Sequence, residues 1–228
     1  KFDNPQPIRQ SERAVIYQTA LEKLITSGAV YVSKEIDEAG QASKRGEVIR
    51  FKNPNQSITF QDVIRGEITF DTRELGDFVI AKSLTEPLYH LAAVVDDWKM
   101  NITHVIRGED HIANTPRQIL IQEALSAPRP SYAHIPLILA PNRSKLSKRH
   151  GAVAVAEYRE RGYLPEALVN YLALLGWNPG GDKEIMDLSE MIKLFDLKDI
   201  NTSSPIFDLK KLEWMNGRYI RKMTDEEF

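Results

Sequence analysis

The sequence contains no cysteine in its 228 residues, which excludes disulfide bonds and thiolate-ligated zinc. Its five histidines are scattered, so a structural metal site of another kind is not expected. No apolar run approaches the roughly 20 residues of a membrane span, and the charged N-terminus does not resemble a signal peptide. We therefore expect a cytoplasmic protein with no zinc, no metal held by its side chains and no membrane partner.

A large excess of charge is also lacking, because 30 Lys and Arg residues are offset by 32 Asp and Glu residues. This balance argues against a dedicated nucleic-acid coat protein, although a local basic stripe suffices for an enzyme that acts on nucleic acid. Hydrophobic residues make up 42% of the chain, as is usual in globular proteins, and the length fits one large domain or a few small ones.

The first part of the sequence predicts a helix followed by a β-rich module. Apolar residues recur at helical spacing from Val15 to Ile25, and Gly28 suits the end of that helix. Short strand-like runs then alternate with Gly, Asn, Pro and Asp turns, with a polar interruption at 37–46. The runs lie at 48–51, 58–60, 68–70 and 78–80.

The remainder predicts an α/β layer followed by helices. The nearly continuous apolar run 91–95 is typical of a buried parallel strand, and 103–106 and 135–140 are further strand candidates, with a helix over 115–125. Helices are predicted over 152–161 and from Pro165 to Gly176. Asp187 and Asp208 are predicted N-caps of two more.

The loop after the last strand candidate carries three cations and a hydroxyl in five residues, Lys145-Leu146-Ser147-Lys148-Arg149. Such a loop can wrap a polyphosphate, with the lysines as point charges and the serine as a hydrogen-bond donor. A solvated basic turn explains the same residues equally well. The pentapeptide alone leaves both interpretations open.

A second charged cluster, Arg107-Gly108-Glu109-Asp110-His111, follows the strand candidate at 103–106. Ligands of open α/β sheets bind at the carboxyl ends of strands, and an arginine there suits a planar carboxylate. The alternative is an internal ion pair of Arg107 with Glu109 or Asp110. A metal site is disfavoured, because adjacent residues rarely converge on one ion.

Two weaker signals complete the candidates. Tyr89 stands just before the run 91–95 and has a polar tip that can orient a substrate, although a structural aromatic is the commoner role. Basic residues of the β-rich module can contact an RNA backbone, although a solvated face is commoner again. They are Lys34, Lys44, Arg45, Arg50 and Lys52.

Nearly the whole chain resembles bacterial-type glutamyl-tRNA synthetases. The run from Ile102 through Val105-Ile106-Arg107-Gly108-Glu109-Asp110-His111 carries much of the likeness, as does Lys145 to Gly151. Further matching stretches are 9–13, 93–97, 114–118, 133–139, 162–168, 170–177, and 207–208 with 211–212. The resemblance favours the phosphate-binding interpretation of the basic loop.

The resemblance implies an ATP- and Mg²⁺-dependent glutamate–tRNA ligase that forms glutamyl-adenylate and transfers glutamate to the 3′ end of tRNA-Glu, acting as a monomer. The implied fold is α/β, the second half of a class I synthetase Rossmann-like catalytic domain with a small β-rich α+β insert and an α-helical stem-contact region. The implied segments are a junction helix at 1–28, the acceptor-binding insert at 29–85, the half-domain at 86–151 and the stem-contact region at 152–228.

The resemblance also implies roles for individual residues. The implied catalytic residues are Lys145, Ser147 and Lys148, with Lys148 stabilising charge that develops on pyrophosphate. Glutamate would contact Tyr89, Arg107 and His111, with Arg107 paired to its side-chain carboxylate. ATP would contact Asp110, Lys148, Arg149 and backbone groups of Leu137 and Ile138. The basic residues Lys44, Arg45, Arg50 and Lys52 remain candidates for tRNA binding on their charge alone.

The sequence departs from the family in three respects. The other ATP signature of the family, His-x-Gly-His, does not occur in it, nor does the first-half arginine for glutamate. We therefore expect that these 228 residues alone do not form the adenylate. The cysteine-rich zinc knuckle of many relatives is absent from the insert, and the anticodon-binding domains would follow Phe228.

Three alternatives stay open on the sequence. One is a paralogue of the glutamyl-queuosine type, which attaches glutamate to a modified tRNA base. Another is a non-catalytic fragment that only binds tRNA. A glutaminyl-tRNA synthetase is weaker, because an arginine at position 107 suits a carboxylate better than an amide.

Overall fold

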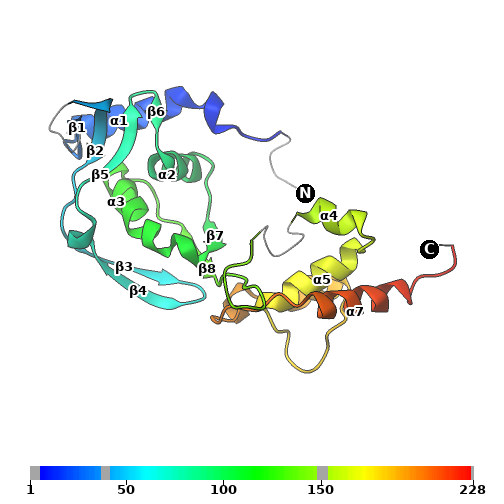
Figure 1. Cartoon of the computed structure of the whole chain (residues 1–228). Coiled ribbons are helices and arrows are strands. Elements are labelled where there is room, and N and C mark those ends of the chain that lie inside the picture. Colours follow the sequence, from blue (N-terminus) through cyan, green and yellow to red (C-terminus); the bar gives the residue numbers. More distant parts are fainter. Residues whose placement is uncertain (1–5, 37–41, 148–153, 227–228) are drawn as a thin grey trace. The chain divides into compact units, whose positions relative to one another are not determined.

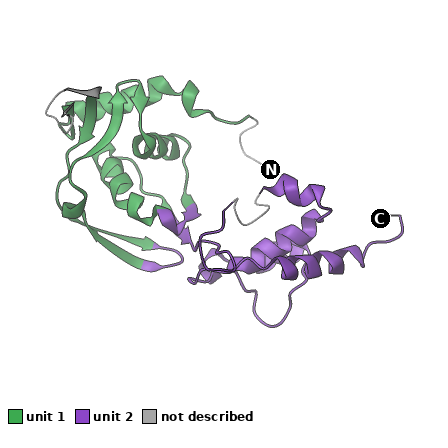
Figure 2. Ribbon diagram, in the orientation of Figure 1, with its two compact units in different colours: residues 1–61, 67–105, 111–131 green, residues 62–66, 106–110, 132–228 purple. Residues whose placement is uncertain are grey.

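The computed structural model describes residues 6–36, 42–147 and 154–226 (Figure 1). The chain divides into two compact units (Figure 2). Unit 1 comprises Lys1–Gln61, Glu67–Val105 and His111–Ser131, and unit 2 comprises Asp62–Gly66, Ile106–Asp110 and Tyr132–Phe228. Neither unit is one continuous stretch of chain, so local sequence texture alone does not mark their limits.

Unit 1 contains an antiparallel sheet and three helices. The sheet has the order β1-β2-β5-β6, formed by β1 (Val30–Ile36), β2 (Ala42–Phe51), β5 (Phe78–Ser83) and β6 (Glu86–Pro87). The helices are α1 (Ala14–Thr26), α2 (Tyr89–Lys99) and α3 (Thr115–Leu125). They pack on one another, and each buries apolar side chains, among them Leu21, Leu91 and Ile119. Gly28 follows α1 at φ +72°, the left-handed conformation that suits a helix end.

A second sheet has strands that contribute residues to both units. Its order is β4-β3-β8-β7, formed by β3 (Ser57–Asp62), β4 (Gly66–Asp71), β7 (His104–Gly108) and β8 (Ser131–Ile135). Strands β3 and β8 run parallel, with Asp62 opposite Tyr132. Short 3-10 helices cover Gln10–Glu12, Thr72–Leu75, Glu109–Asn114 (η3) and Leu197–Asp199.

The C-terminal part of unit 2 is helical. It contains α4 (Val155–Glu160), α5 (Pro165–Gly176), α6 (Leu188–Leu194) and α7 (Leu209–Ile220). Helices α5 and α7 pack together through a cluster that contains Tyr171, Leu212 and Met215. The predicted caps are confirmed, because the Asp187 side chain accepts from Glu190 N at 2.8 Å and that of Asp208 accepts from Lys210 N at 2.9 Å.

The strand predicted at 91–95 is wrong, because these residues lie in helix α2. Leu91, Val94 and Val95 are all buried, and their spacing of three and four residues puts them on one helical face. A short, nearly continuous apolar run is compatible with a strand or with a buried helix. Packing against α1 and α3 stabilises the helix here.

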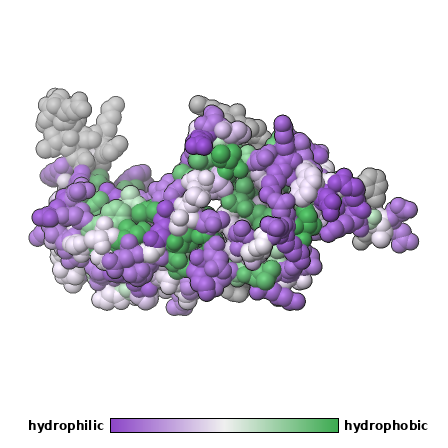
Figure 3. Space-filling model, turned by 90° about the horizontal axis from the view of Figure 1, so that it is seen from below, coloured by the Kyte–Doolittle hydropathy of each residue, from purple (hydrophilic) through white to green (hydrophobic). Residues whose placement is uncertain are grey.

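The strand predicted at 135–140 is wrong beyond Ile135. Strand β8 ends at that residue, because Pro136 has no N–H with which to continue the ladder. Most of the other predicted elements agree with the structure except in their bounds. Strand β2 begins at Ala42, inside the interruption predicted at 37–46. Within the described residues, no helix combines the length and the apolar character that a membrane span requires. Apolar side chains such as Val15 and Trp214 also reach the surface, and Figure 3 shows apolar residues among polar ones, so burial defines the core better than hydropathy does.

Candidate active site

The predicted site residues fall into both units. Tyr89, His111, Arg50 and Lys52 belong to unit 1. Unit 2 holds Arg107, Asp110, Leu137, Ile138, Lys145 and Ser147. Lys148 and Arg149 lie outside the described residues, and for Lys44 and Arg45 only their place in β2 is described.

Tyr89 and His111 lie together in unit 1, as their shared assignment predicts. Tyr89 opens helix α2 and is 50% exposed, and its hydroxyl is 3.4 Å from His111 Nδ1 on η3. The Asn114 amide nitrogen is 3.1 Å from the same Nδ1. Since an amide nitrogen only donates, His111 Nδ1 accepts and the ring proton is on Nε2. The exposed hydroxyl and the Nε2–H are groups that suit a polar ligand.

Arg107, on strand β7, is held from behind by a buried histidine. Its Nε donates to His134 Nε2 at 3.1 Å, and its guanidinium carbon lies 5.7 Å from the centre of the Tyr132 ring. His134 Nδ1 is 2.6 Å from Asp62 Oδ2, and the side chains of His134 and Asp62 are fully buried. Burial lowers the pKa of His134 below 6.5, against the opposing hydrogen bond from Asp62, so the ring is neutral near pH 7.

Glu109 connects three segments of unit 2. Its carboxylate forms an ion pair with Arg65, accepts from Leu137 N at 2.9 Å and accepts from Ser204 Oγ at 3.2 Å. The chain after β8 is therefore fixed against the end of β7. Because the Leu137 N–H is bonded inside the protein, the Leu137 carbonyl and the Ile138 N–H are the backbone groups better suited to an adenine base.

The described part of the basic loop folds back on the chain after β8. Leu146 N donates to Ile138 O at 3.0 Å, and Ala140 N donates to Ser144 O at 2.8 Å. Lys145 Nζ reaches Asp110 Oδ2 at 2.7 Å, with the two side chains 60% and 40% exposed. The structure therefore brings together a residue assigned to catalysis, Lys145, and one assigned to ATP, Asp110, from different parts of the sequence. An exposed ammonium in this position can exchange its carboxylate partner for a phosphate oxygen.

Gly108 allows the tight approach of Asp110 to the end of β7. A Cβ at this position would lie 2.6 Å from Asp110 Oδ1 and 3.7 Å from Leu137 Cδ2. A larger residue would therefore push the Asp110 carboxylate aside, and with it the contact to Lys145.

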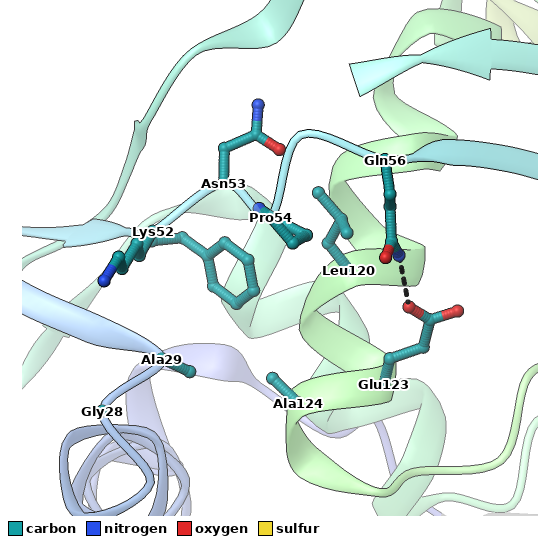
Figure 4. Close-up of a pocket in the computed structure, with 10 residues that line it drawn as sticks. Gly28, Ala29, Lys52, Asn53, Pro54, Gln56, Leu120, Glu123 and Ala124 are labelled. Carbon is teal, nitrogen blue, oxygen red and sulfur yellow. Dashed lines mark hydrogen bonds between the residues drawn. The ribbon is translucent and has the colours of Figure 1, made fainter. Parts of the chain in front are cut away.

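The two described basic candidates of the β-rich module differ in their surroundings. The Arg50 guanidinium donates to the carbonyl oxygen of Asp77, the residue before β5, at 3.1 Å. Lys52 lines a cavity of about 400 Å³ formed by the chain after α1, the chain after β2 and helix α3 (Figure 4). Gln56 and Glu123 also line this cavity, and Gln56 Nε2 donates a hydrogen bond to Glu123 Oε2 at 3.2 Å. A carboxylate at this place disfavours a phosphate group inside the cavity. Lys52 can therefore contact a phosphate only outside the cavity.

Sequence reasoning missed the residues that support the candidates. Asp62, Arg65 and His134 were not singled out, and Glu109 was considered as an ion-pair partner of Arg107 and as a disfavoured metal ligand, not as a partner of Arg65. The one signal was a histidine inside an otherwise apolar strand. Within the ranges that the structure describes, no three His, Asp or Glu side chains gather in a way that suits a metal ion.

Comparison with known proteins adds the family. The chain matches the family model of the tRNA synthetases class I (E and Q), catalytic domain, over residues 32–214. It is 49% identical to a glutamate–tRNA ligase of Aquifex aeolicus, over 94% of this chain and 52% of the relative. It is 44% identical to a glutamate–tRNA ligase of Natranaerobius thermophilus, over 96% and 52% respectively. The chain thus spans about half the length of the curated relatives it matches.

A solved structure agrees with these relatives. The crystal structure of a glutamate tRNA ligase from Elizabethkingia meningosepticum, in complex with its amino acid, matches 98% of this chain and 56% of its own, with a TM-score of 0.87 and 33% identity. The predicted α/β fold of a class I synthetase catalytic domain is thereby confirmed. Because the family model covers most of the chain, this chain belongs to the class I tRNA synthetases of the E and Q type, within their catalytic domain.

Proposed function

We propose that the chain supplies glutamate- and ATP-binding residues of a glutamate–tRNA ligase. In this reaction a glutamate carboxylate oxygen attacks the α-phosphorus of ATP and releases pyrophosphate. The 3′-terminal hydroxyl of tRNA-Glu then attacks the carbonyl carbon of the adenylate, and AMP leaves. The relatives at 44% and 49% identity are named glutamate–tRNA ligases, which favours this activity over attachment of glutamate to a modified tRNA base.

The observation that carries the proposal is the setting of Arg107. It stands at the carboxyl end of β7, and its Nε is held by His134. A guanidinium with a fixed plane recognises a carboxylate through two parallel hydrogen bonds. A neutral amide in the same place would bring no negative charge to the guanidinium, so the site should reject glutamine. Tyr89 and His111 are proposed as further glutamate contacts.

The ATP side of the proposal rests on the loop at 145–149. Lys148 is proposed to stabilise the charge that develops on pyrophosphate as it leaves, with Lys145 as a second point charge, Ser147 as a hydrogen-bond donor and Arg149 as a contact to ATP. Preorganised cations suit this task, and the contact between Lys145 and Asp110 holds one of them in place. Mg²⁺ would accompany the phosphates of ATP.

The tRNA side rests on weaker support. The exposed Lys52 and the partly exposed Arg50 stand in the β-rich segment 29–85, which we propose as the acceptor-binding insert together with Lys44 and Arg45. Residues 1–28 are proposed as the helix at its junction with the catalytic domain, 86–151 as the second half of that domain and 152–228 as the stem-contact region. We also propose that the protein is a cytoplasmic monomer and binds no zinc.

Glutamate-dependent ATP–pyrophosphate exchange tests the proposal. The assay uses the 228-residue chain and the same chain joined behind the opening half-domain of the Aquifex aeolicus relative. We expect exchange only in the joined protein, because the sequence contains no His-x-Gly-His. Arg107→Ala should lower kcat/KM for glutamate by at least about two to three orders of magnitude with the circular dichroism spectrum unchanged.

A control variant distinguishes the effect of removing Arg107 from the effect of removing any arginine. Arg73 is an exposed arginine of unit 1 whose ion pair is with Asp71, two residues away. Arg73→Ala should leave exchange at the level of the unchanged protein. Undiminished exchange in Arg107→Ala would contradict the assignment of the glutamate carboxylate to this residue.

A further inference from the structure

The hydrogen bonds behind Arg107 define the protonation state of His134. An arginine Nε–H can only donate, so His134 Nε2, at 3.1 Å, must accept and carries no proton. The ring proton is then on Nδ1, where it is donated to Asp62 Oδ2 at 2.6 Å. A charged imidazolium would have no acceptor for Arg107 and would repel its guanidinium. The geometry therefore requires the neutral Nδ1–H tautomer.

Asp62 is itself fixed by the backbone. Its Oδ1 accepts from the N–H groups of Ile64 and Arg65, both at 3.0 Å, and its Oδ2 accepts from His134 N at 3.1 Å. These donors bind the ionised carboxylate at the turn between β3 and β4. The carboxylate has one orientation, so the imidazole that it bonds also has one orientation.

The imidazole also separates two charges. A carboxylate bonded directly to Arg107 Nε would offset the positive charge that is needed to select an acidic substrate. In the observed arrangement the negative charge of Asp62 is one imidazole ring away from the guanidinium. A neutral acceptor at Nε2 fixes the plane of the guanidinium, and this bond uses only its Nε.

We propose that His134 and Asp62 are positioning residues, which set the orientation of Arg107 for the side-chain carboxylate of an acidic amino acid. This proposal rests on the proposed function. Neither residue touches the substrate in it. Asp62 sets the tautomer of His134, and His134 sets the plane of Arg107. The same arrangement should therefore govern the preference for glutamate over glutamine.

The tautomer is tested in the 228-residue chain, without any assay of activity. In a sample labelled with ¹⁵N-histidine, long-range ¹H–¹⁵N correlation spectra should show a protonated Nδ1 and an unprotonated Nε2 for His134, assigned by loss of the signal in His134→Gln. Asp62→Asn should change this tautomer, because its amide nitrogen would face Nδ1 as a donor. An Nε2–H tautomer or an imidazolium in the unchanged chain at neutral pH would overturn the proposal.

The positioning role is tested by glutamate-dependent exchange in the joined protein described above. His134→Phe keeps a ring but removes the acceptor, and should raise KM for glutamate by about tenfold to a hundredfold, with KM for ATP unchanged. His134→Gln places an oxygen near the former Nε2 and should recover most of this loss. The ratio of kcat/KM for glutamate to that for glutamine should fall in His134→Phe and Asp62→Asn.

A buried polar residue elsewhere in unit 2 is the matched control. Asn170 is fully buried and accepts from Met186 N at 2.9 Å and from the Tyr219 hydroxyl at 2.8 Å. Asn170→Ser should lower stability without changing KM for glutamate. If His134→Phe lowers kcat/KM for glutamate and kcat/KM for ATP by the same factor, or if Asn170→Ser raises KM for glutamate as much as His134→Phe does, the positioning role is wrong. If the unchanged joined protein shows no exchange at all, the proposed function fails instead, and the tautomer result still decides the hydrogen-bond arrangement.

Discussion

Asp96 provides the sharpest test of how helix α2 is held in unit 1. Its carboxylate accepts from Gln10 Nε2 at 2.9 Å, from Arg13 Nε at 2.7 Å and from the Tyr17 hydroxyl at 2.9 Å. The Asp96 and Arg13 side chains are only 13% and 15% exposed. Burial, and then the hydrogen bond to Asp96, raise the pKa of Tyr17 to about 12. The cluster joins α1 to α2, the helix that begins at Tyr89.

Two substitutions at Asp96 should differ in a defined way. In Asp96→Asn the remaining oxygen can still accept from Arg13 and Tyr17, and Gln10 can turn its own amide to match the new nitrogen. The loss is then chiefly that of charge, about 1–2 kcal/mol of unfolding free energy. Asp96→Ala removes every acceptor and leaves the Arg13 charge and the buried Tyr17 hydroxyl without one, which should cost about 3–5 kcal/mol.

Urea denaturation followed by circular dichroism measures both values, and a double-mutant cycle with Arg13→Met measures the coupling. The coupling energy between Asp96 and Arg13 should be about 1–2 kcal/mol in favour of the pair. The loss in Asp96→Ala should also fall when Arg13 has been replaced, because no buried charge is then left unpaired. A cost below about 1 kcal/mol for Asp96→Ala, or equal costs for the two substitutions, would refute this account of the cluster.

Two further predictions concern unit 2. The folded state lowers the pKa of His134 below 6.5, chiefly through burial, with Arg107 and Arg65 acting in the same direction and Asp62 against them. The unfolded chain therefore binds this proton first as pH falls, so the stability contributed by the neutral ring is fully present above about pH 6.5 and is lost below it. Urea midpoints measured from about pH 8 to about pH 5 should show this slope, and His134→Gln should reduce it; an equal slope in both would contradict it. Lys145→Ala removes an ion pair between exposed groups, so it should change stability by less than about 0.5 kcal/mol, while it should lower exchange in the joined protein at least about tenfold. Lys210→Ala, at another exposed lysine, is the control, and a large loss of stability in Lys145→Ala would contradict the exposed pairing.

Local signals account for what the sequence predicted correctly. Asp187 and Asp208 are caps because a short carboxylate ahead of an apolar stripe meets the first free N–H groups of a helix. Pro165 and Gly162 mark a helix start and a left-handed turn for reasons within a few residues of chain. The run 91–95 contains no local signal that distinguishes a helix from a strand, because its apolar residues are nearly continuous. The segments against which it packs are distant in the sequence.

The residues of the candidate site also differ in whether a local sequence signal reveals them. Arg107, Asp110 and Lys145 stand out in the sequence because their charges cluster at the ends of apolar runs. Asp62 and His134 are separated by 72 residues, and Arg65 and Glu109 by 44. Neither pair has a local pattern, so only the pairing of β3 with β8 brings the first pair together. The residues proposed to contact a substrate therefore have a signal in the sequence, whereas the pairs that support them have none.

The turn between β3 and β4 limits how freely the segment 29–85 can be recombined. Asp62 and Arg65 belong to that stretch of sequence, yet their side chains bond His134 and Glu109. A graft that transplanted the whole segment from a relative would also exchange Asp62, which supports the arginine proposed to select the amino acid through His134, and Arg65, the ion-pair partner of Glu109. Chimeras in this family should therefore keep residues 62–66 with the recipient, or transfer His134 and Glu109 along with the segment. The segment is continuous in sequence, but it cannot be exchanged on its own without changing hydrogen bonds to residues outside it.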